Sequence, residues 1–295
     1  RITKVMGIVN GTTNYILDQM DTTGAAFEDA LAEAQRLGYA EADPTADVEG
    51  HDAAAKAAIL GTLAFHAPFS IDEVYCEGIT GITGDDMEAA AASGYVIKLL
   101  AIIEKTEAGA ILRVHPTLLP RTHPLASVRG AFNAVFVVAE NAGELMFYGQ
   151  GAGGQPTSSA IMGDVVSAAR RLRSGTAEVP GLREQAADSA VPALPIKKAE
   201  TQYYIDMVVA DREGVIAEVA RVLADHHVSI ESMRQPGSVS AEGEVDVEGV
   251  DKKGAVVQIV THLAREKDLD DTVATLKGLG VVKAVNSVLR VEVEQ

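Results

Sequence analysis

The sequence predicts an α+β protein of two domains, and three observations lead to this prediction. Residues 1–178 mix helical and strand periodicities, residues 179–200 are rich in Pro, Ala and small polar residues, and residues 201–295 show the order βαββαβ. At 295 residues the chain is long enough to form two cores. We therefore expect a mixed-sheet domain with helices, a linker, and a ferredoxin-like unit.

The elements of the first domain follow from its periodicity and its turn residues. The chain opens in a strand-like run that ends in a turn at Asn10-Gly11. Helices are expected over 12–20, 27–38 and 52–65, and strands over 95–105, 111–119, 132–140 and 144–149. Gly38 is the expected C-cap of the second helix. A closing helix over 156–172 carries Pro156 near its first turn.

In the second domain, apolar residues recur with the period of the element that holds them. One face of the strand over 202–210 is apolar, with Tyr203, Ile205, Met207 and Val209. The helix over 214–226 has an apolar stripe of Val215, Ile216, Val219, Val222 and Leu223. Strands over 228–235 and 255–263, joined by a polar loop over 236–254, precede a helix over 269–279. The last strand is expected to turn Val285, Leu289, Val291 and Val293 inward.

Composition excludes several classes of partner. The formal net charge of −17 disfavours binding to nucleic acid or to an anionic membrane. No apolar run reaches the roughly 18 residues that a membrane helix needs. The single Cys76 allows no internal disulfide, which fits a reducing cytoplasm, and no zinc-type spacing of Cys and His occurs.

The segment "GYAEADPTADVEGHDAAAK", residues 38–56, gathers carboxylates before one lysine. Asp52 and Lys56 are four residues apart and share a helix face, which is compatible with an exposed salt bridge. Lys56 is also the single charge in the apolar run from Ala53 to Phe65, so it is expected to be partly buried and able to exchange a proton with a substrate oxygen. With the loop carboxylates Glu41 and Asp47, it would suit a zwitterionic substrate.

A calcium loop is the competing interpretation of this segment. Asp43, Thr45 and Asp47 have the spacing of its first three ligands. However, Val48 and Ala54 occupy the positions where an EF-hand needs glycine and glutamate, so we reject it. Asp43 and Glu49 are expected to be solvated loop charges.

Two further motifs, one rich in glycine and one that contains two threonines, each allow a structural and a functional interpretation. "YGQGAGGQPTSSA" contains G-x-G-x-x-G at Gly149, Gly151 and Gly154, but no acidic strand end follows at the spacing of a dinucleotide fold. It predicts a tight strand-to-helix turn, whose helix start could approach an anionic ligand. In "GIVNGTTNYIL", Thr12 or Thr13 is either an N-cap or a hydroxyl facing a cleft.

Taken together, "GIVNGTTNYIL", "GYAEADPTADVEGHDAAAK", "RVHPTLLP" and "YGQGAGGQPTSSA" resemble the homoserine dehydrogenase family. The C-terminal module is similar to an ACT domain, a small amino-acid-sensing fold. The resemblance implies NADP- or NAD-dependent interconversion of L-homoserine and L-aspartate 4-semialdehyde, on the route to threonine, methionine and isoleucine. The expected domains are a substrate domain over 1–178, a linker over 179–200 and an ACT domain over 201–295.

The resemblance also implies roles for individual residues. Lys56 is expected to be the catalytic acid or base, with Asp52 beside it. The residues expected to bind substrate are Glu41, Asp47, Asp52, Tyr39 and Thr12. The residues expected to contact the nicotinamide cofactor are Gly38, Gly149 and Gly151, of which Gly151 is the preferred glycine in its turn.

The ACT resemblance implies regulation and assembly. Such modules pair and bind an effector between them, so a homodimer or homotetramer is expected, with threonine as the feedback inhibitor. In "DREGVIAEVA", Gly214 lies at the turn into the first helix, where bare backbone N–H groups could meet an amino-acid carboxylate, although a good turn would also explain it. Asp211 and Ile230 are the other effector-binding candidates.

The sequence departs from the family in one respect. Family members begin with a nucleotide-binding domain, which carries another active-site lysine and is followed by a monovalent-cation loop, whereas this sequence begins at Arg1 within the substrate domain. We therefore expect the N-terminal domain to be missing here, the chain to be inactive alone, and any cation to bind mainly upstream. A catalytically silent, amino-acid-binding regulatory protein is the alternative.

Overall fold

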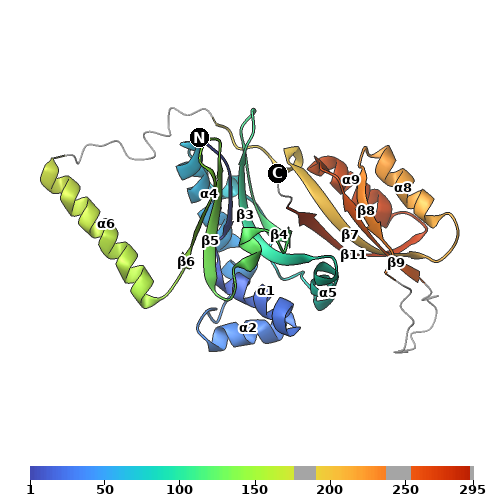
Figure 1. Cartoon of the computed structure of the whole chain (residues 1–295), viewed down its shortest axis with the longest axis horizontal. Coiled ribbons are helices and arrows are strands. Elements are labelled where there is room, and N and C mark those ends of the chain that lie inside the picture. The colour runs from blue at the N-terminus through green and yellow to red at the C-terminus, as the bar shows by residue number, and fades with distance from the viewer. Residues whose placement is uncertain (176–190, 237–253, 293–295) are drawn as a thin grey trace. The chain divides into compact units, whose positions relative to one another are not determined.

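The computed structural model describes residues 1–175, 191–236 and 254–292. By its contacts the chain divides into two compact units, Arg1–Ile196 and Lys197–Gln295 (Figure 1). Most of the expected linker, most of the polar loop over 236–254, and Val293 lie outside the described residues. Within the described part, no helix is both long and apolar enough to cross a membrane.

The first unit is built on a sheet with the strand order β6-β5-β1-β3-β4. These strands are β1 (Ile2–Ile8), β3 (Tyr95–Lys105), β4 (Ala110–Pro120), β5 (Phe132–Ala139) and β6 (Gly143–Gln150). Neighbouring strands on this path are antiparallel, while the short β2 (Tyr75–Cys76) pairs with β4 in parallel. The sheet is therefore mixed, as predicted, and the predicted strands are confirmed.

Helices accompany this sheet. They are α1 (Gly11–Thr23), α2 (Phe27–Arg36), α3 (Thr45–Val48), α4 (His51–Phe65), α5 (Gly84–Ala92) and α6 (Gly154–Ser174), with short 3₁₀ turns at Ile71–Glu73, Pro124–Ser127 and Ile196–Lys198. The four predicted helices are confirmed. The helices α3 and α5 were not predicted, although a capping box of Thr83 and Asp86 marks the start of α5.

The helix α4 packs on one face of the sheet, and an apolar cluster lies on the opposite face of β3. Gly61 lets α4 approach the sheet closely, since a Cβ there would lie 3.0 Å from Leu112 and 3.4 Å from Ile103. Ile102 points to the opposite face because successive strand residues alternate. There it joins an apolar cluster with Leu125 and Val128 of the connection between β4 and β5.

Capping hydrogen bonds define the C-terminal end of α2 and the N-terminal end of α1. After α2, Gly38 adopts φ 77°, its N–H donates to the carbonyl of Gln35, and the N–H of Tyr39 donates to that of Ala34. This is the Schellman pattern, so the predicted role of Gly38 at the helix end is confirmed. At the start of α1 the expectation was wrong: the N-cap is Asn10, whose side chain accepts from the N–H of Thr13, because the helix already begins at Gly11.

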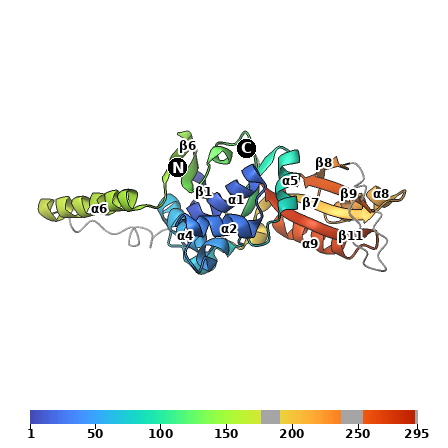
Figure 2. The ribbon, with the colours of Figure 1, turned by 90° about the horizontal axis from the view of Figure 1, so that it is seen from below.

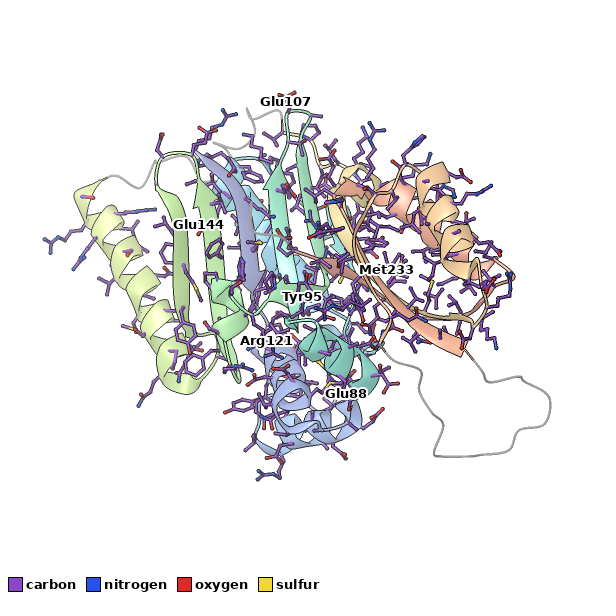
Figure 3. All side chains as sticks on the ribbon, turned by 45° about the vertical axis from the view of Figure 1, so that its right-hand side comes forward. Glu88, Tyr95, Glu107, Arg121, Glu144 and Met233 are labelled. Atoms are coloured by element: carbon purple, nitrogen blue, oxygen red, sulfur yellow. The ribbon has the colours of Figure 1, made fainter. Side chains whose placement is uncertain are left out.

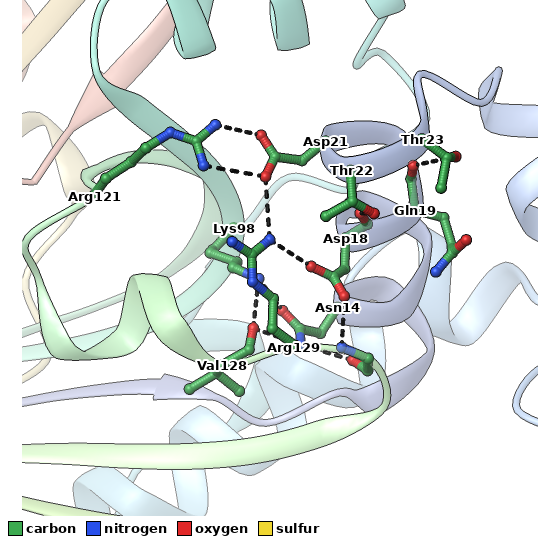
Figure 4. Close-up of polar contacts among 11 residues, drawn as sticks. Asn14, Asp18, Gln19, Asp21, Thr22, Thr23, Lys98, Arg121, Val128 and Arg129 are labelled. Atoms are coloured by element: carbon green, nitrogen blue, oxygen red, sulfur yellow. Dashed lines mark hydrogen bonds and ion pairs between the residues drawn. The ribbon is translucent and has the colours of Figure 1, made fainter.

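A buried lysine anchors α1 to β3 (Figure 4). Lys98 is fully buried, and its Nζ donates to Oδ1 of Asn14 at 2.9 Å and to the carbonyl of Val128 at 2.7 Å. Burial lowers the pKa of Lys98 from 10.5 to about 8, although the negative charge of Asp18 acts in the opposite direction.

Ion pairs fasten the C-terminal half of α1 to the connection between β4 and β5 (Figure 4). Arg129 pairs with Asp18 at 2.8 Å, and Arg121 pairs with Asp21 at 2.6 Å. Burial alone would raise the pKa of Asp21, but hydrogen bonds from Arg121 and Arg129 hold it below its usual value. These contacts hold α1 against that connection.

The second unit has the order βαββαβ, with a short extra strand. Its elements are β7 (Glu200–Ala210), α8 (Val215–Asp225), β8 (Ile230–Arg234), β9 (Gly254–Thr261), β10 (Ala264–Arg265), α9 (Glu266–Lys277) and β11 (Val282–Val291) (Figure 2). The strand order β11-β7-β9-β8 is that of a ferredoxin-like unit. Both helices cover one sheet face, where Met233 of β8 packs against their shared core (Figure 3).

The predicted facing of three side chains in this unit, one in α8 and two in β11, was wrong. Ile216, assigned to the apolar stripe of α8, is 38% exposed. In β11 a bulge between Val285 and Ser287 changes which residues face the helices, so that Val285 and Val288 pack on the core. Leu289 and Val291 pair with Tyr204 and Gln202 on the other face, because one extra residue reverses the alternation of a strand.

Candidate active site

The predicted pair of Asp52 and Lys56 forms on the first turns of α4. Nζ of Lys56 lies 2.6 Å from Oδ2 of Asp52 and donates a second hydrogen bond, of 2.8 Å, to the carbonyl oxygen of Val9. The two side chains are 42% and 35% exposed, respectively. The lysine is thus held in a fixed place by a charge and a dipole, yet remains reachable from solvent.

Asn10, which was predicted only as part of a turn, joins this pair to a second carboxylate, that of Asp47. Its Nδ2 donates to Oδ1 of Asp47 at 2.6 Å and to Oδ2 of Asp52 at 2.9 Å. Asn10 itself is buried. Its position directly before the helix, where asparagine is a favoured N-cap, was the one signal in the sequence that could have found it.

Thr12, Gly38 and Tyr39 come together beside the start of α1. The hydroxyl of Thr12 donates to the carbonyl of Tyr39 at 2.5 Å, which links α1 to the end of α2. The ring of Tyr39 contacts that of Tyr15 with centroids 5.1 Å apart and is 47% exposed. A Cβ built on Gly38 would meet no atom within 4 Å, so its backbone borders open space.

The remaining carboxylates of the segment lie apart from the lysine. Glu41 is exposed, and within the described residues no hydrogen bond or ion pair joins it to Lys56. Asp43 accepts from the N–H and hydroxyl of Thr45 at the start of α3, and these bonds lower the pKa of its carboxyl. Glu49 accepts from the hydroxyl of Thr80.

The glycine turn between β6 and α6 lies against Asn133 of β5. A Cβ on Gly151 would be 2.0 Å from Nδ2 of Asn133, whereas a Cβ on Gly149 would meet nothing within 4 Å. The Asn133 side chain also lies near Gly11, at whose position a Cβ would be 3.5 Å from its Oδ1. Asn133 therefore accounts for the need for glycine at 151.

Two of the glycines expected to contact a cofactor border open space. Gly38 and Gly149 present bare backbone to open space, where a flat ring or an amide could approach. The first turn of α6 carries no acidic residue, so its N–H groups are compatible with a polar or anionic group. No group of three or more His, Cys, Asp or Glu side chains in the described residues could hold a metal ion.

Two of the effector candidates lie in the turn between β7 and α8. Gly214 precedes α8 with φ 84°, and its carbonyl accepts from the N–H of Glu218. Asp211 is exposed in the same turn. Ile230 begins β8 and packs partly against the core of the unit.

The sequence matches known proteins over its whole length. The sequence model described as "Homoserine dehydrogenase" matches residues 1–166. The homoserine dehydrogenase of Corynebacterium glutamicum is 53% identical over 297 residues, covering 99% of this chain and 63% of the relative. That of Mycobacterium tuberculosis H37Rv is 53% identical over 296 residues, covering 99% of this chain and 65% of the relative.

Solved structures agree with these relatives. A crystal structure of a homoserine dehydrogenase from Thiobacillus denitrificans superimposes with a TM-score of 0.89 at 40% identity, covering 99% of this chain and 64% of that chain. One from S. aureus gives a TM-score of 0.71 at 32% identity, covering 99% and 65%. The chain thus spans slightly less than two thirds of the length of these proteins. On these matches and on the site described above, the chain belongs to the homoserine dehydrogenase family.

Proposed function

We propose that the protein carrying this chain interconverts L-homoserine and L-aspartate 4-semialdehyde with a nicotinamide cofactor, NADP or NAD, in amino-acid biosynthesis. The observation that carries the proposal is the pair of Asp52 and Lys56, 2.6 Å apart on α4 and partly open to solvent. Family membership supplies the substrate, and the pair supplies a proton donor suited to a carbonyl that becomes a hydroxyl.

Lys56 is assigned the transfer of the proton to and from the substrate oxygen. The bound cofactor supplies the hydride. In the reductive direction, the Lys56 ammonium gives a proton to the oxygen of the former aldehyde as its negative charge develops. Asp52 and the carbonyl of Val9 hold Nζ in place through bonds of 2.6 and 2.8 Å. In the oxidative direction the neutral amine accepts the hydroxyl proton.

Substrate binding is assigned to the surrounding residues. The carboxylates of Asp47 and Glu41 would attract the substrate ammonium group, with Glu41 moving in from its exposed position when substrate binds. Thr12 and Tyr39, already joined by a hydrogen bond, would form one wall of the pocket. The backbones of Gly38, Gly149 and Gly151 would border the nicotinamide, and any monovalent cation would bind mainly outside this chain.

The second unit is proposed to act as an ACT regulatory domain with threonine as its effector. Its βαββαβ order and the open turn at Gly214 support this assignment. Asp211 and Ile230 would complete the effector site in a homodimer or homotetramer. Calorimetry of the whole protein with L-threonine tests the proposal: saturable heat at millimolar ligand supports it, and no heat contradicts it.

The enzymatic proposal is tested by assaying the whole natural protein that carries this sequence. Reduction of L-aspartate 4-semialdehyde should consume NADPH or NADH, as followed by absorbance, and L-homoserine should drive the reverse reaction. A well-folded protein that turns over neither substrate with either cofactor contradicts the proposal. Threonine binding without turnover would instead favour a regulatory protein that binds amino acids.

A further inference from the structure

Asn10 makes hydrogen bonds to three elements at once. Its Nδ2 donates to Asp47 of α3 at 2.6 Å and to Asp52 of α4 at 2.9 Å. Its Oδ1 accepts from the N–H of Thr13 at 2.9 Å and from the hydroxyl of Thr13 at 3.0 Å, which caps α1. Both amide hydrogens have acceptors and the oxygen has two donors, so the contacts settle which end of the carboxamide is which.

The bond to Asp52 bears directly on the lysine. Oδ2 of Asp52 accepts from Nδ2 of Asn10 and from Nζ of Lys56, so one oxygen connects the two donors. The backbone of Val9, the residue before Asn10, supplies the other bond to Nζ. The short segment of Val9 and Asn10 therefore fixes both acceptors that hold the lysine.

A neutral amide is the group that suits this place. The carboxylates of Asp47 and Asp52 converge on Nδ2, and an amide offers each a hydrogen without adding charge. A serine could still cap α1, but its single hydroxyl hydrogen could not serve both carboxylates. An aspartate could also cap α1, but it would place a third negative charge beside the other two.

We propose that Asn10 is a positioning residue of the active site, which orients the carboxylate of Asp52 and thereby the ammonium of Lys56, and which also holds Asp47. The proposal rests on the proposed function for its kinetic consequence, and on the hydrogen bonds of Asn10 for its structural one. It separates two roles of one side chain: the oxygen caps α1, and the nitrogen organises the site.

The first test compares Asn10→Ser with the wild-type whole protein. Because serine and asparagine are comparable N-caps, stability should change little through the cap. Loss of hydrogen bonds to two charged groups should lower kcat/KM about 10- to 100-fold, mainly through kcat. Thr83→Ala, which removes the N-cap of α5 away from the site, is the matched control: it should lower the melting temperature and leave kcat within about twofold.

The second test uses Asn10→Asp as a pH-dependent rescue. When protonated, the introduced carboxyl group can donate a hydrogen bond where the amide did, whereas its ionised form repels Asp47 and Asp52. The charged groups that face this position are Asp47 on α3 and both Asp52 and Lys56 on α4. Activity relative to wild type should therefore rise as the pH falls for Asn10→Asp, and not for Asn10→Ser. A purely structural cap would give no such difference.

A third measurement does not depend on turnover. A double-mutant cycle compares Asn10→Ser, Asp52→Asn and the double variant by urea unfolding. The change in the unfolding equilibrium constant of the double variant should differ from the product of the two single changes by a factor of about 3 or more. Multiplicative effects overturn the proposal, as does a kcat/KM of Asn10→Ser within about twofold of wild type. If the parent protein lacks the proposed activity, that function fails, and the cycle still decides the role of Asn10.

Discussion

Nζ of Lys56 lies 2.8 Å from the carbonyl oxygen of Val9, which ties the lysine of α4 to the chain just beyond β1. The backbone carbonyl is a dipole that cannot move independently of the sheet, so it holds the ammonium more rigidly than a second side chain would. Together with Asp52 it leaves Nζ one further hydrogen for a ligand. The site is therefore organised before substrate arrives.

The first prediction concerns Asp52. Asp52→Asn keeps the shape of the side chain and removes the charge that faces Lys56, so kcat of the whole enzyme should fall by about 10². Asp43→Asn is the matched control, because Asp43 is exposed and bonds to Thr45 instead. Steady-state kinetics with aspartate semialdehyde would show the difference, and equal kcat values for both variants would count against the role of Asp52.

The second prediction separates two glycines of the turn before α6. Gly151→Ala should destabilise the protein by about 1–3 kcal/mol, because the new methyl group overlaps the side chain of Asn133. Gly149→Ala should have little effect, since its position is open. Urea unfolding measures both.

A second-site change checks the cause of this difference. Asn133→Gly should restore most of the stability lost in Gly151→Ala, because it removes the atoms that the methyl group would meet. If Gly151→Ala is as stable as Gly149→Ala, or if Asn133→Gly gives no recovery, the close packing is wrong.

The third prediction follows from burial of Lys98, whose pKa of about 8 lies below the 10.5 of an unfolded lysine. Between these values the unfolded chain binds more protons than the native one, so native stability should rise with pH. Below pH 8 both states are protonated and the destabilisation is constant. The difference corresponds to a gain of about 3 kcal/mol across this range.

Lys98→Met is the comparison that isolates this effect. The variant should lack that part of the rise in unfolding free energy between pH 8 and 10.5, whatever its absolute stability. Urea unfolding at several pH values measures the two slopes. Parallel slopes for wild type and variant would show that Lys98 does not titrate in this range.

Local spacing was enough to predict some of these features. Asp52 and Lys56 are four residues apart on a helix, so the sequence alone places them side by side. The role of Gly38 at the end of α2 follows from equally local rules. The five long strands of the first unit were also recognisable, because their apolar runs are bounded by turn residues, whereas the two-residue β2 was not predicted.

Other features depend on contacts between distant segments. Asn10 meets its carboxylates across 37 and 42 residues of sequence, and nothing in the local pattern indicates those partners. In the sequence, Lys98 is simply one charged residue within a predicted strand. Only the fold shows that it is buried against α1. The bulge in β11 is likewise a tertiary feature, and it reversed the predicted facing of Leu289.

The turnover of Lys56→Ala in the whole protein tests most directly whether Lys56 is the proton donor. If Lys56 is the proton donor, kcat for reduction of aspartate semialdehyde should fall by roughly 10²–10⁴, while the exposed control Lys277→Ala keeps its activity. Circular dichroism should show that both variants remain folded. A Lys56→Ala enzyme with kcat within a few-fold of wild type would show that Lys56 is not the proton donor.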